Sequence, residues 1–382
     1  LFADIHLIDS KKPMHFIKIY SLIILSSFFC FIFFISCDPL VTTFDDTENA
    51  VMYKSGSIQS PPAQVDQVKV MTWNIRFGAA RLPWFGDSCG DRVILSEDEV
   101  KHNLKALAEF INTAEPDILF INEIDIESKR TAYIDQVQWL LDHTYFNYGV
   151  YASNWKSQFI PSDGLGRMNM GNAVLSRWKI NEAVRIKLPL RGDQDALTEY
   201  FYLRRNILKT KISLPNLDNF YAVTAHLSAF STDDTKQKQV DKVIETLENI
   251  NNDGGIFIAG GDFNLLPPNA FKTDYCIEDM CSDESYHQPG DDPFHKEGSY
   301  FTPERTWLQP VYNLYQPAVS LVTYGSNESH YFTHTPKTDR YWDRKIDYLF
   351  TNAQWIAGSD STYQNIFELS DHAPVSAEWE LP

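Results

Sequence analysis

The sequence is poor in positive charge for its length. Its 382 residues include 33 Lys and Arg against 51 Asp and Glu, which gives a formal net charge of −18. Proteins that grip long nucleic-acid duplexes usually carry a basic stripe, because neutralising phosphates supplies much of their affinity. The balance therefore disfavours a stable nucleic-acid complex, although a local basic cleft or a bound metal ion would still supply positive charge.

Cysteine is also scarce, and no Cys/His spacing resembles a zinc cluster. Cys30 lies inside an apolar run and Cys37 directly follows that run. In an exported protein, Cys276 and Cys281 are close enough in the sequence to close a small disulfide loop, and Cys89 would then have no disulfide partner. Three free thiols are the alternative.

One long hydrophobic run is present, over residues 19–35, and it carries no charge. A lysine precedes it and small residues follow, which is the order of a secretory signal peptide. Ser36-Cys37 resembles the lipobox of bacterial lipoproteins, although Phe34 departs from the usual Leu. We expect residues 1–36 to be upstream residues and signal peptide, Cys37 to be the lipidation site, and the protein to be exported and membrane-anchored at the cell envelope. A single spanning anchor or simple secretion is the alternative, because a span needs roughly 17–25 residues.

Behind this segment the chain changes character. Residues 37–66 are rich in Asp, Thr, Ser, Pro and Gln without periodicity, so we expect a flexible tether. From residue 67 to 382 strand and helix patterns alternate, no internal repeat is visible, and one large domain is expected. Ser96 and Glu99 form a capping box that begins a helix. Further helices are predicted over 132–141 and 232–250, and strands over 68–75, 118–121, 172–176, 208–212, 220–225, 256–259, 346–350 and 374–379.

The predicted strands repeatedly end in polar residues that can titrate or bind a metal ion. α/β proteins place their chemistry where strand ends gather at one edge of a sheet. Any single end could be a turn, and Asp262-Phe263-Asn264 alone fits an Asx-turn. Together they predict one site of carboxylates, amides and imidazoles, a set that can bind a hard cation and act on a phosphate ester. The strand-end residues are Asn74, Glu123, His226, Asp262, Asn264, Asp371 and His372.

These residues resemble the motifs of the endonuclease/exonuclease/phosphatase superfamily, which includes pancreatic-type deoxyribonucleases, abasic-site endonucleases, neutral sphingomyelinases and inositol polyphosphate 5-phosphatases. The resemblance covers roughly residues 65–382, and its motifs follow the family's order. Gly261-Asp262-Phe263-Asn264 and Ser370-Asp371-His372 are the most specific. The other matching stretches are 71–75, 121–123, 171–176, Arg205, 225–226 and 345–348.

The resemblance implies an α/β (α+β) fold of the deoxyribonuclease I type, a four-layer sandwich of two packed mixed β-sheets flanked by helices. It also implies a metal site in which Glu123 is the main carboxylate, with Asn74 and Asp371 close by. Oxygen ligands without a Cys/His cage suit Mg²⁺, with Mn²⁺ or Ca²⁺ as alternatives, better than Zn²⁺.

The same resemblance implies catalytic roles for the remaining residues. Asp262 would orient or deprotonate the attacking water, and Asn264 and His226 would contact the scissile phosphate. Asp347 would hold His372, which would face the same phosphate. Arg205 and Asn172 would support the phosphate site.

We therefore expect a divalent-metal-dependent hydrolase of phosphoester bonds, a monomeric phosphodiesterase acting on a phospholipid headgroup, a nucleotide or a similar substrate. Two readings stay open, a secreted nuclease and a catalytically silent binding protein with this fold. Leu227-Ser228-Ala229-Phe230 lacks the Asn or other polar contact that some nuclease members carry after this His. The irregular segment 269–305 is expected to be a substrate-side loop.

Overall fold

Two β-sheets packed face to face form the centre of the fold. The computed structural model describes residues 40–86, 89–281 and 296–381, and in this part of the chain each sheet has seven strands. The first sheet has the order β13 (Ser361–Thr362), β14 (Val375–Glu380), β3 (Gln67–Asn74), β4 (Ile118–Asp125), β6 (Gly166–Ser176), β5 (Tyr148–Ile160), β2 (Val51–Lys54). The second has the order β1 (Thr47–Asn49), β7 (Ile180–Lys187), β8 (Asn206–Leu214), β9 (Leu217–Ala225), β10 (Ile256–Asp262), β12 (Asp347–Thr351), β11 (Gln316–Pro317).

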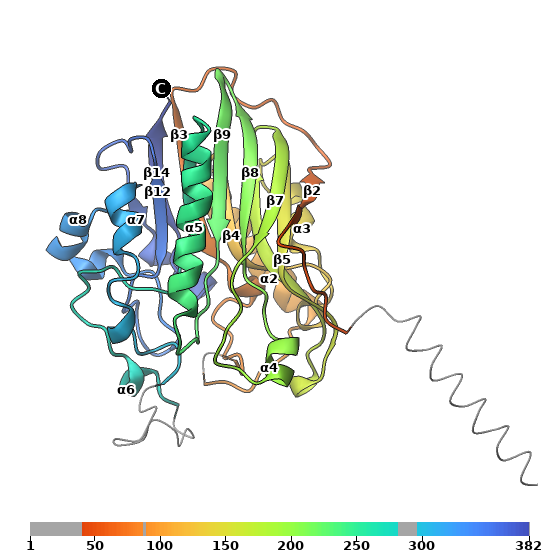
Figure 1. Ribbon diagram of the computed structural model, residues 1–382. Coiled ribbons are helices and arrows are strands. Elements are labelled where there is room, and N and C mark those ends of the chain that lie inside the picture. Colours follow the sequence, from red (N-terminus) through yellow and green to blue (C-terminus); the bar gives the residue numbers. More distant parts are fainter. Residues whose placement is uncertain (1–39, 87–88, 282–295, 382) are drawn as a thin grey trace, which may run out of the picture. The chain divides into compact units, whose positions relative to one another are not determined.

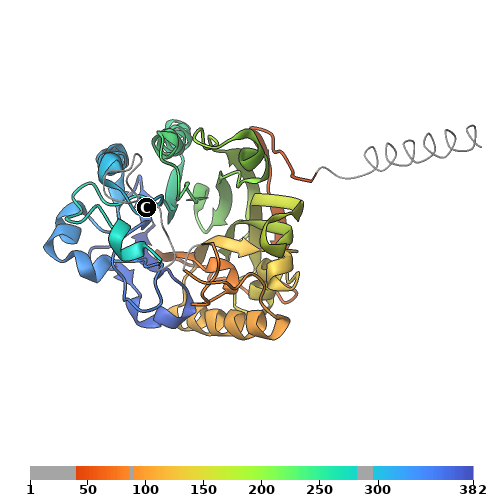
Figure 2. The ribbon, with the colours of Figure 1, turned by 90° about the horizontal axis from the view of Figure 1, so that it is seen from below.

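Helices cover the outer faces of both sheets. Figure 2 shows α2 and α5 on opposite sides of the strands. Both sheets are mixed, because β3 and β4 are parallel, as are β9 and β10, whereas the other pairs are antiparallel. The expected four-layer α/β sandwich is therefore confirmed. The helices are α2 (Glu97–Ala114), α3 (Gln136–His143), α4 (Ala196–Phe201), α5 (Thr235–Asn252), α6 (Cys276–Asp279), α7 (Gln309–Leu314) and α8 (Leu321–Ser326), with 3-10 turns at Arg76–Gly78, Lys129–Thr131, Ser162–Gly164, Thr302–Glu304, Glu328–Tyr331 and Gln364–Leu369.

The alternation of side chains along each strand explains the layers. In β3, Val68 and Val70 point into the core between the sheets, whereas Met71 and Trp73 pack in the layer with α2 and α3. The other strands follow the same rule. A third cluster between the second sheet and helices α5 and α7 completes the burial. Each sheet is thus covered on both faces, which is why its strands read as nearly continuous apolar runs.

Most predicted elements are present with shifted ends. The capping box at Ser96 and Glu99 starts α2 as expected, with both reciprocal hydrogen bonds formed. The helix predicted over 132–141 begins later, at Gln136, because Asp135 caps it by accepting a hydrogen bond from the Gln138 backbone N–H. The segment 269–305 also contains the short helix α6, and its residues 282–295 lie outside the described part.

The predicted flexible tether, residues 37–66, is wrong for much of its length. β1 pairs with β7 at the edge of the second sheet, and β2 pairs with β5 at the edge of the first. Backbone hydrogen bonding to exposed sheet edges overrides the polar, aperiodic composition, because an edge strand needs only its N–H and C=O groups. The stretch from Thr47 to Lys54 therefore belongs to the fold.

Both alternatives for the cysteines, a Cys276–Cys281 disulfide and three free thiols, are wrong. Cys89 bonds to Cys281, 192 residues away, and Cys276 is a buried free thiol. Residues 276–279 form helix α6, and Cys276 turns its sulfur towards the Lys296 backbone N–H instead. The hydrophobic run 19–35 and Cys37 lie outside the described residues. Among the residues that are described, no helix combines the length and apolar character needed to cross a bilayer.

Candidate active site

The strand pairing brings the predicted site residues to one edge of the two sheets. In the first sheet Asn74 of β3 lies opposite Asn122 of β4, and Glu123 follows directly. In the second sheet Asp262 of β10 lies opposite Asp347 of β12, and His226 follows the end of β9. Figure 1 shows β9 running down to this edge, where the loops that carry α4 and α6 lie.

Asp262 lies at the centre of the site and is almost fully buried, at 1% exposure. Its Oδ2 atom accepts a hydrogen bond from Asn74 Nδ2 at 3.0 Å and lies 3.2 Å from His226 Nε2 and 3.7 Å from His372 Nε2. Its Oδ1 atom accepts the Asn264 backbone N–H at 3.0 Å, so the predicted Asx-turn is present within the site. Burial opposes the charged form, but the two imidazoles outweigh it and hold the pKa of Asp262 below its usual value.

The glycine before Asp262 allows this close approach. Gly261 has φ +135°, and a Cβ placed there would meet the Ala225 carbonyl oxygen at 2.0 Å. Only glycine fits this position without moving β9 away from β10. The Gly-Asp-Phe-Asn motif is therefore a packing requirement as well as a chemical one.

Asp347 and His372 form a buried pair, with His372 Nδ1 and Asp347 Oδ2 2.8 Å apart. Burial opposes the charged imidazole, but the carboxylates of Asp347 and Asp262 outweigh it and raise the pKa of His372 to about 10. His226 behaves oppositely, because burial and the nearby Arg205 lower its pKa to about 4. At neutral pH one imidazole is charged and the other neutral, so the two histidines can do different work.

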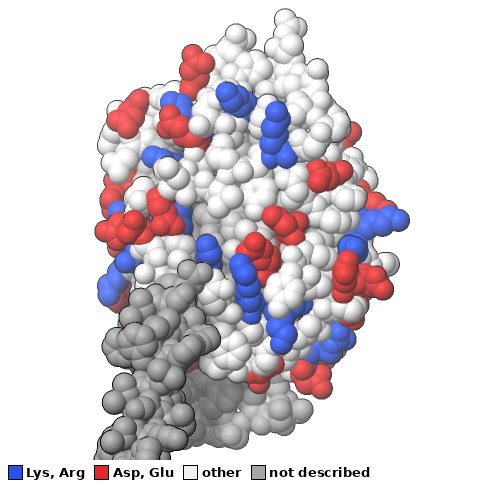
Figure 3. All heavy atoms as spheres, turned by 90° about the vertical axis from the view of Figure 1, so that its right-hand side faces the viewer, with Lys and Arg blue, Asp and Glu red and all other residues white. Residues whose placement is uncertain are grey.

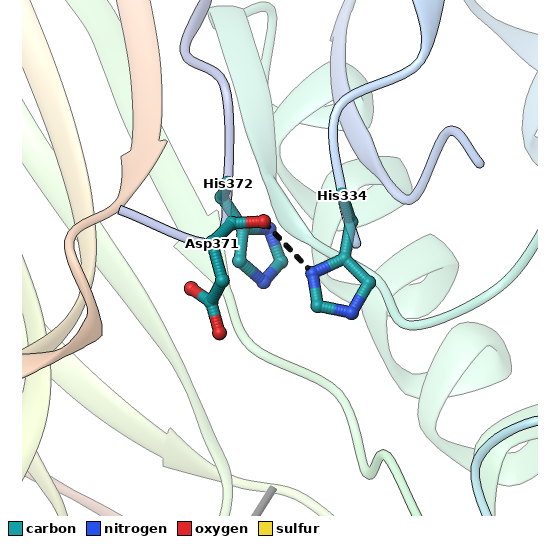
Figure 4. Close-up of side chains that lie close together, drawn as sticks. All are labelled: His334, Asp371 and His372. Carbon is teal, nitrogen blue, oxygen red and sulfur yellow. Dashed lines mark hydrogen bonds between the residues drawn. The ribbon is translucent and has the colours of Figure 1, made fainter. Parts of the chain in front are cut away.

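The negative charge of Asp371 is balanced by an arginine of the same chain. Its Oδ2 atom lies 3.1 Å from Arg76 Nε, and its Oδ1 atom accepts the Ser370 hydroxyl at 3.2 Å. Figure 4 shows that His334 lies beside Asp371 and His372, with His334 Nδ1 donating to the Asp371 backbone oxygen at 3.1 Å. The two histidine rings are 4.4 Å apart, and burial, His372 and Arg344 lower the pKa of His334.

Oxygen donors suited to a hard cation face this site. The Glu123 side chain is 23% exposed, more than its charged neighbours, and its Oε1 atom lies 3.9 Å from His226 Nε2. Glu123 has φ +54°, where the pairing of β4 with β6 shifts register, so the backbone turns this carboxylate out of the strand alternation. Two groups of potential ligand atoms, all within 4.8 Å of one another, occur among the described residues, and neither contains Glu123. They are His334, Asp371 and His372, and Asp262, Asp347 and His372.

Arg205 lines the pocket, and part of its guanidinium lacks hydrogen-bond partners. Its side chain is 6% exposed, and its Nε and Nη1 atoms have no hydrogen-bond partner within the described ranges. Burying guanidinium nitrogens without hydrogen-bond partners is costly, which makes Arg205 a candidate for contact with an anion. Asn172 lies deeper. Its amide contacts Asn122, Asn154 and Asn206 and does not face the cavity directly.

The pocket around these residues is small. It encloses a cavity of about 160 Å³, below the roughly 300–1,000 Å³ of sites for drug-sized ligands. Glu123, Arg205, His226, Asp262 and His372 line its polar side. Apolar and aromatic residues line the rest, among them Trp84, Trp155, Met170, Tyr202 and Phe230.

Sequence reasoning missed three residues of the site, Arg76, His334 and Asn122. Arg76 stands two residues after Asn74, and Asn122 directly precedes Glu123, so position next to a predicted strand end could have flagged both. His334 lies in an irregular segment 38 residues before His372, and no pattern in the sequence connects the two.

Comparison with known proteins gives one family match and structural neighbours with a similar fold. The model of the Endonuclease/Exonuclease/phosphatase family matches residues 71–372. The crystal structure of an endonuclease/exonuclease/phosphatase from Beutenbergia cavernae DSM 12333 is 18% identical, covers 83% of this chain and 72% of its own, and has a TM-score of 0.51. The human Nocturnin catalytic domain with bound sulfate anion is 15% identical, with coverages of 86% and 96% and a TM-score of 0.47. No curated protein matches the sequence.

Proposed function

The chain belongs to the endonuclease/exonuclease/phosphatase family, and from this we propose that it is a divalent-metal-dependent hydrolase of phosphodiester bonds. One observation carries the proposal. A small pocket holds a buried carboxylate, Asp262, between two imidazoles of opposite charge preference, with the unpaired guanidinium of Arg205 on its wall. That combination suits an anionic tetrahedral group attacked by water.

Glu123 and Asp371, which line the pocket, would hold the metal ion through carboxylate oxygens. Asn74 would add its amide oxygen, which accepts the Arg76 backbone N–H at 3.0 Å in this structure. A bound Mg²⁺ would neutralise the phosphate and lower the pKa of water there. Mn²⁺ or Ca²⁺ would fit the same ligands. The two groups of potential ligand atoms that contain His372 would also offer imidazole nitrogen to a metal ion.

The protein's own side chains have distinct catalytic and phosphate-binding roles. Asp262 stays ionised and can orient the attacking water or accept a proton from it. Charged His372, held by Asp347, donates towards a phosphoryl oxygen, and Arg205 pairs with another. Neutral His226, with Asn264, binds the phosphate without adding charge. Each group is almost fully buried or held by backbone contacts, so little reorganisation is needed during the reaction.

The substrate is inferred to be small or to present a terminal phosphodiester. Arg205, His226, Asp262, Asp371 and His372 are each 1–6% exposed, so only a slender group reaches them. Figure 3 draws the right-hand side of Figure 1, and acidic and basic side chains are interspersed on that face.

A substrate panel with and without Mg²⁺ tests the function. Bis-p-nitrophenyl phosphate, sphingomyelin, inositol phosphates, single-stranded RNA and duplex DNA would be compared. We expect chelator-sensitive hydrolysis of the small diester and slow cleavage of duplex DNA. Fast duplex cleavage would favour the nuclease reading, and no hydrolysis despite metal binding would favour a silent binding protein.

We further propose export and anchoring at the cell envelope through Cys37. The Cys89–Cys281 disulfide supports an oxidising compartment, since disulfides are rare in reducing cytosol. Expression of Cys37→Ala beside the unchanged chain tests the anchor. We expect the variant to leave the membrane fraction or to accumulate as an uncleaved precursor. Membrane retention with the whole run 19–35 still attached would support a spanning anchor instead.

A further inference from the structure

We propose that Asn122, a residue without contact to the pocket, is a positioning residue that sets Asp262 against Glu123. This inference rests on the proposed function, because it assigns a means of aligning the same site. The two carboxylates belong to different sheets, and nothing covalent fixes their separation. A fully buried amide between the sheets, at 0% exposure, does so through hydrogen bonds.

The Asn122 side chain contacts three other strands. Its Oδ1 atom accepts the Asp262 backbone N–H at 2.8 Å, and its Nδ2 atom donates to Asn172 Oδ1 at 2.9 Å. Longer contacts from Nδ2 reach Thr224 Oγ1 at 3.4 Å and the Ala225 backbone oxygen at 3.5 Å. Its own strand partner is Asn74. Asn122 therefore connects the middle of β6 and the ends of β9 and β10 to β4, at the point where the chain turns to Glu123.

Asn122 is the first member of an amide cluster, which we define as Asn122, Asn154, Asn172 and Asn206. Asn154 Nδ2 donates to Asn172 Oδ1 at 3.1 Å, and Asn206 Nδ2 donates to Asn154 Oδ1 at 2.7 Å. Asn172 Nδ2 closes the ring on Asn206 Oδ1 at 3.3 Å. Asn206 belongs to β8 in the second sheet and the other three belong to the first, so the cluster joins the sheets.

The position of the cluster follows from strand alternation. Along the inward face, Ile118 and Phe120 precede Asn122, and Val150 and Ala152 precede Asn154, with the apolar residues in the core between the sheets. The cluster thus forms a layer between that core and the catalytic edge. Primary amides suit this layer because each offers donors and acceptors but no charge that would disturb the ionised Asp262.

Asn122 aligns more than it stabilises, and a matched control separates the two effects. Asn147 is equally buried, at 1% exposure, and its amide makes three hydrogen bonds, to the Gln59 backbone N–H and O and to the Arg177 backbone O. It lies beside Ser176, at the end of the first sheet opposite the site. Asn122→Leu and Asn147→Leu each remove a buried amide of similar size.

The experiment compares both variants with the unchanged full chain, using bis-p-nitrophenyl phosphate and Mn²⁺. We expect both to lower Tm, and only Asn122→Leu to lower kcat, by about 10- to 100-fold, because small misplacements of reacting groups cost about that much. KM and the Mn²⁺ dissociation constant from calorimetry should stay within about threefold. Amide hydrogen exchange at Asp262 should quicken in Asn122→Leu alone.

If Asn122→Leu does not fold, Asn122→Ala against Asn147→Ala repeats the comparison at a temperature where circular dichroism shows both folded. The inference is overturned if kcat of the Asn122 variant stays within about threefold of the unchanged chain, or if the Asn147 variant loses as much. Failure of the proposed function is distinct, since the unchanged chain would then hydrolyse nothing. Hydrogen exchange at Asp262 would still decide the positioning role.

Discussion

Breaking the Asp347–His372 pair should disable the enzyme almost as thoroughly as removing the imidazole. The perturbation is Asp347→Asn, which keeps the size of a fully buried side chain but removes its charge. The amide can donate to His372 Nδ1 as well as accept from it, so the imidazole loses both its fixed tautomer and its ion pair. His372 would then face the phosphate in the wrong protonation state.

The size of the effect follows from the geometry. His372 Nδ1 lies 2.8 Å from Asp347, and His372 is 4% exposed, so water cannot replace the carboxylate. Losing one preorganised donor typically costs on the order of 10²–10³ in turnover, or about 3–4 kcal/mol at about 1.4 kcal/mol per tenfold. Independent effects would multiply to about 10⁴–10⁶ in the double variant. Residues that act as a unit should instead give a double variant close to either single variant.

The assay is kcat for Asp347→Asn, His372→Ala and the double variant, with Asp117→Asn as control. Asp117 pairs with Arg177 at 2.8 Å at the start of β4, far from the site, and its loss should leave kcat unchanged. Fully multiplicative losses in the double variant would refute the reasoning. Equal losses from the control would mean that the assay reports folding alone.

The pair also predicts a pH dependence. The pKa of His372 is raised from 6.5 to about 10 in the folded protein, so its proton stabilises the fold fully below pH 6.5, and this contribution fades as the pH rises through about 10. Asp347→Asn removes the favourable carboxylate and should lower that pKa. The alkaline limb of the kcat profile should therefore move to lower pH. A limb that stays in place would show that another group controls it.

Three further predictions concern other residues. Glu123→Gln should abolish most activity and weaken Mg²⁺ binding while the fold survives. Unchanged Mg²⁺ dependence of turnover would show that Glu123 is not a metal ligand. Non-reducing peptide mapping should recover Cys89 linked to Cys281, and a peptide that links Cys276 to Cys281 would contradict the fold. Cys89→Ser should lower the free energy of unfolding, measured by denaturant titration, by about 2–5 kcal/mol. Arg205→Met should lower kcat/KM on the order of 10²-fold, because a charged contact to the phosphate is lost. Its Tm should stay unchanged or rise, because the substitution removes an unpaired buried charge. A clear fall in Tm would show that Arg205 is structural.

Local signals in the sequence determined the edge of the sheets that carries the site. Apolar runs ending in Asn74, Glu123, His226, Asp262 and His372 fixed which residues meet, because parallel neighbours and short hairpins bring strand ends to common edges. The capping box at the start of α2 could also be predicted from the sequence, since it answers a local backbone requirement.

Tertiary structure decided whatever depends on contacts between distant segments. Composition described residues 37–66 as a tether, but two free sheet edges took up β1 and β2. Proximity in the sequence suggested Cys276 with Cys281 as one possibility, but the fold placed Cys89 beside Cys281. Contacts between distant segments also explain three further features, namely Arg76 beside Asp371, His334 beside His372, and the amide cluster between the sheets. Each pairs groups whose separation along the chain carries no information about their separation in space, so only the packing of the two sheets could bring them together.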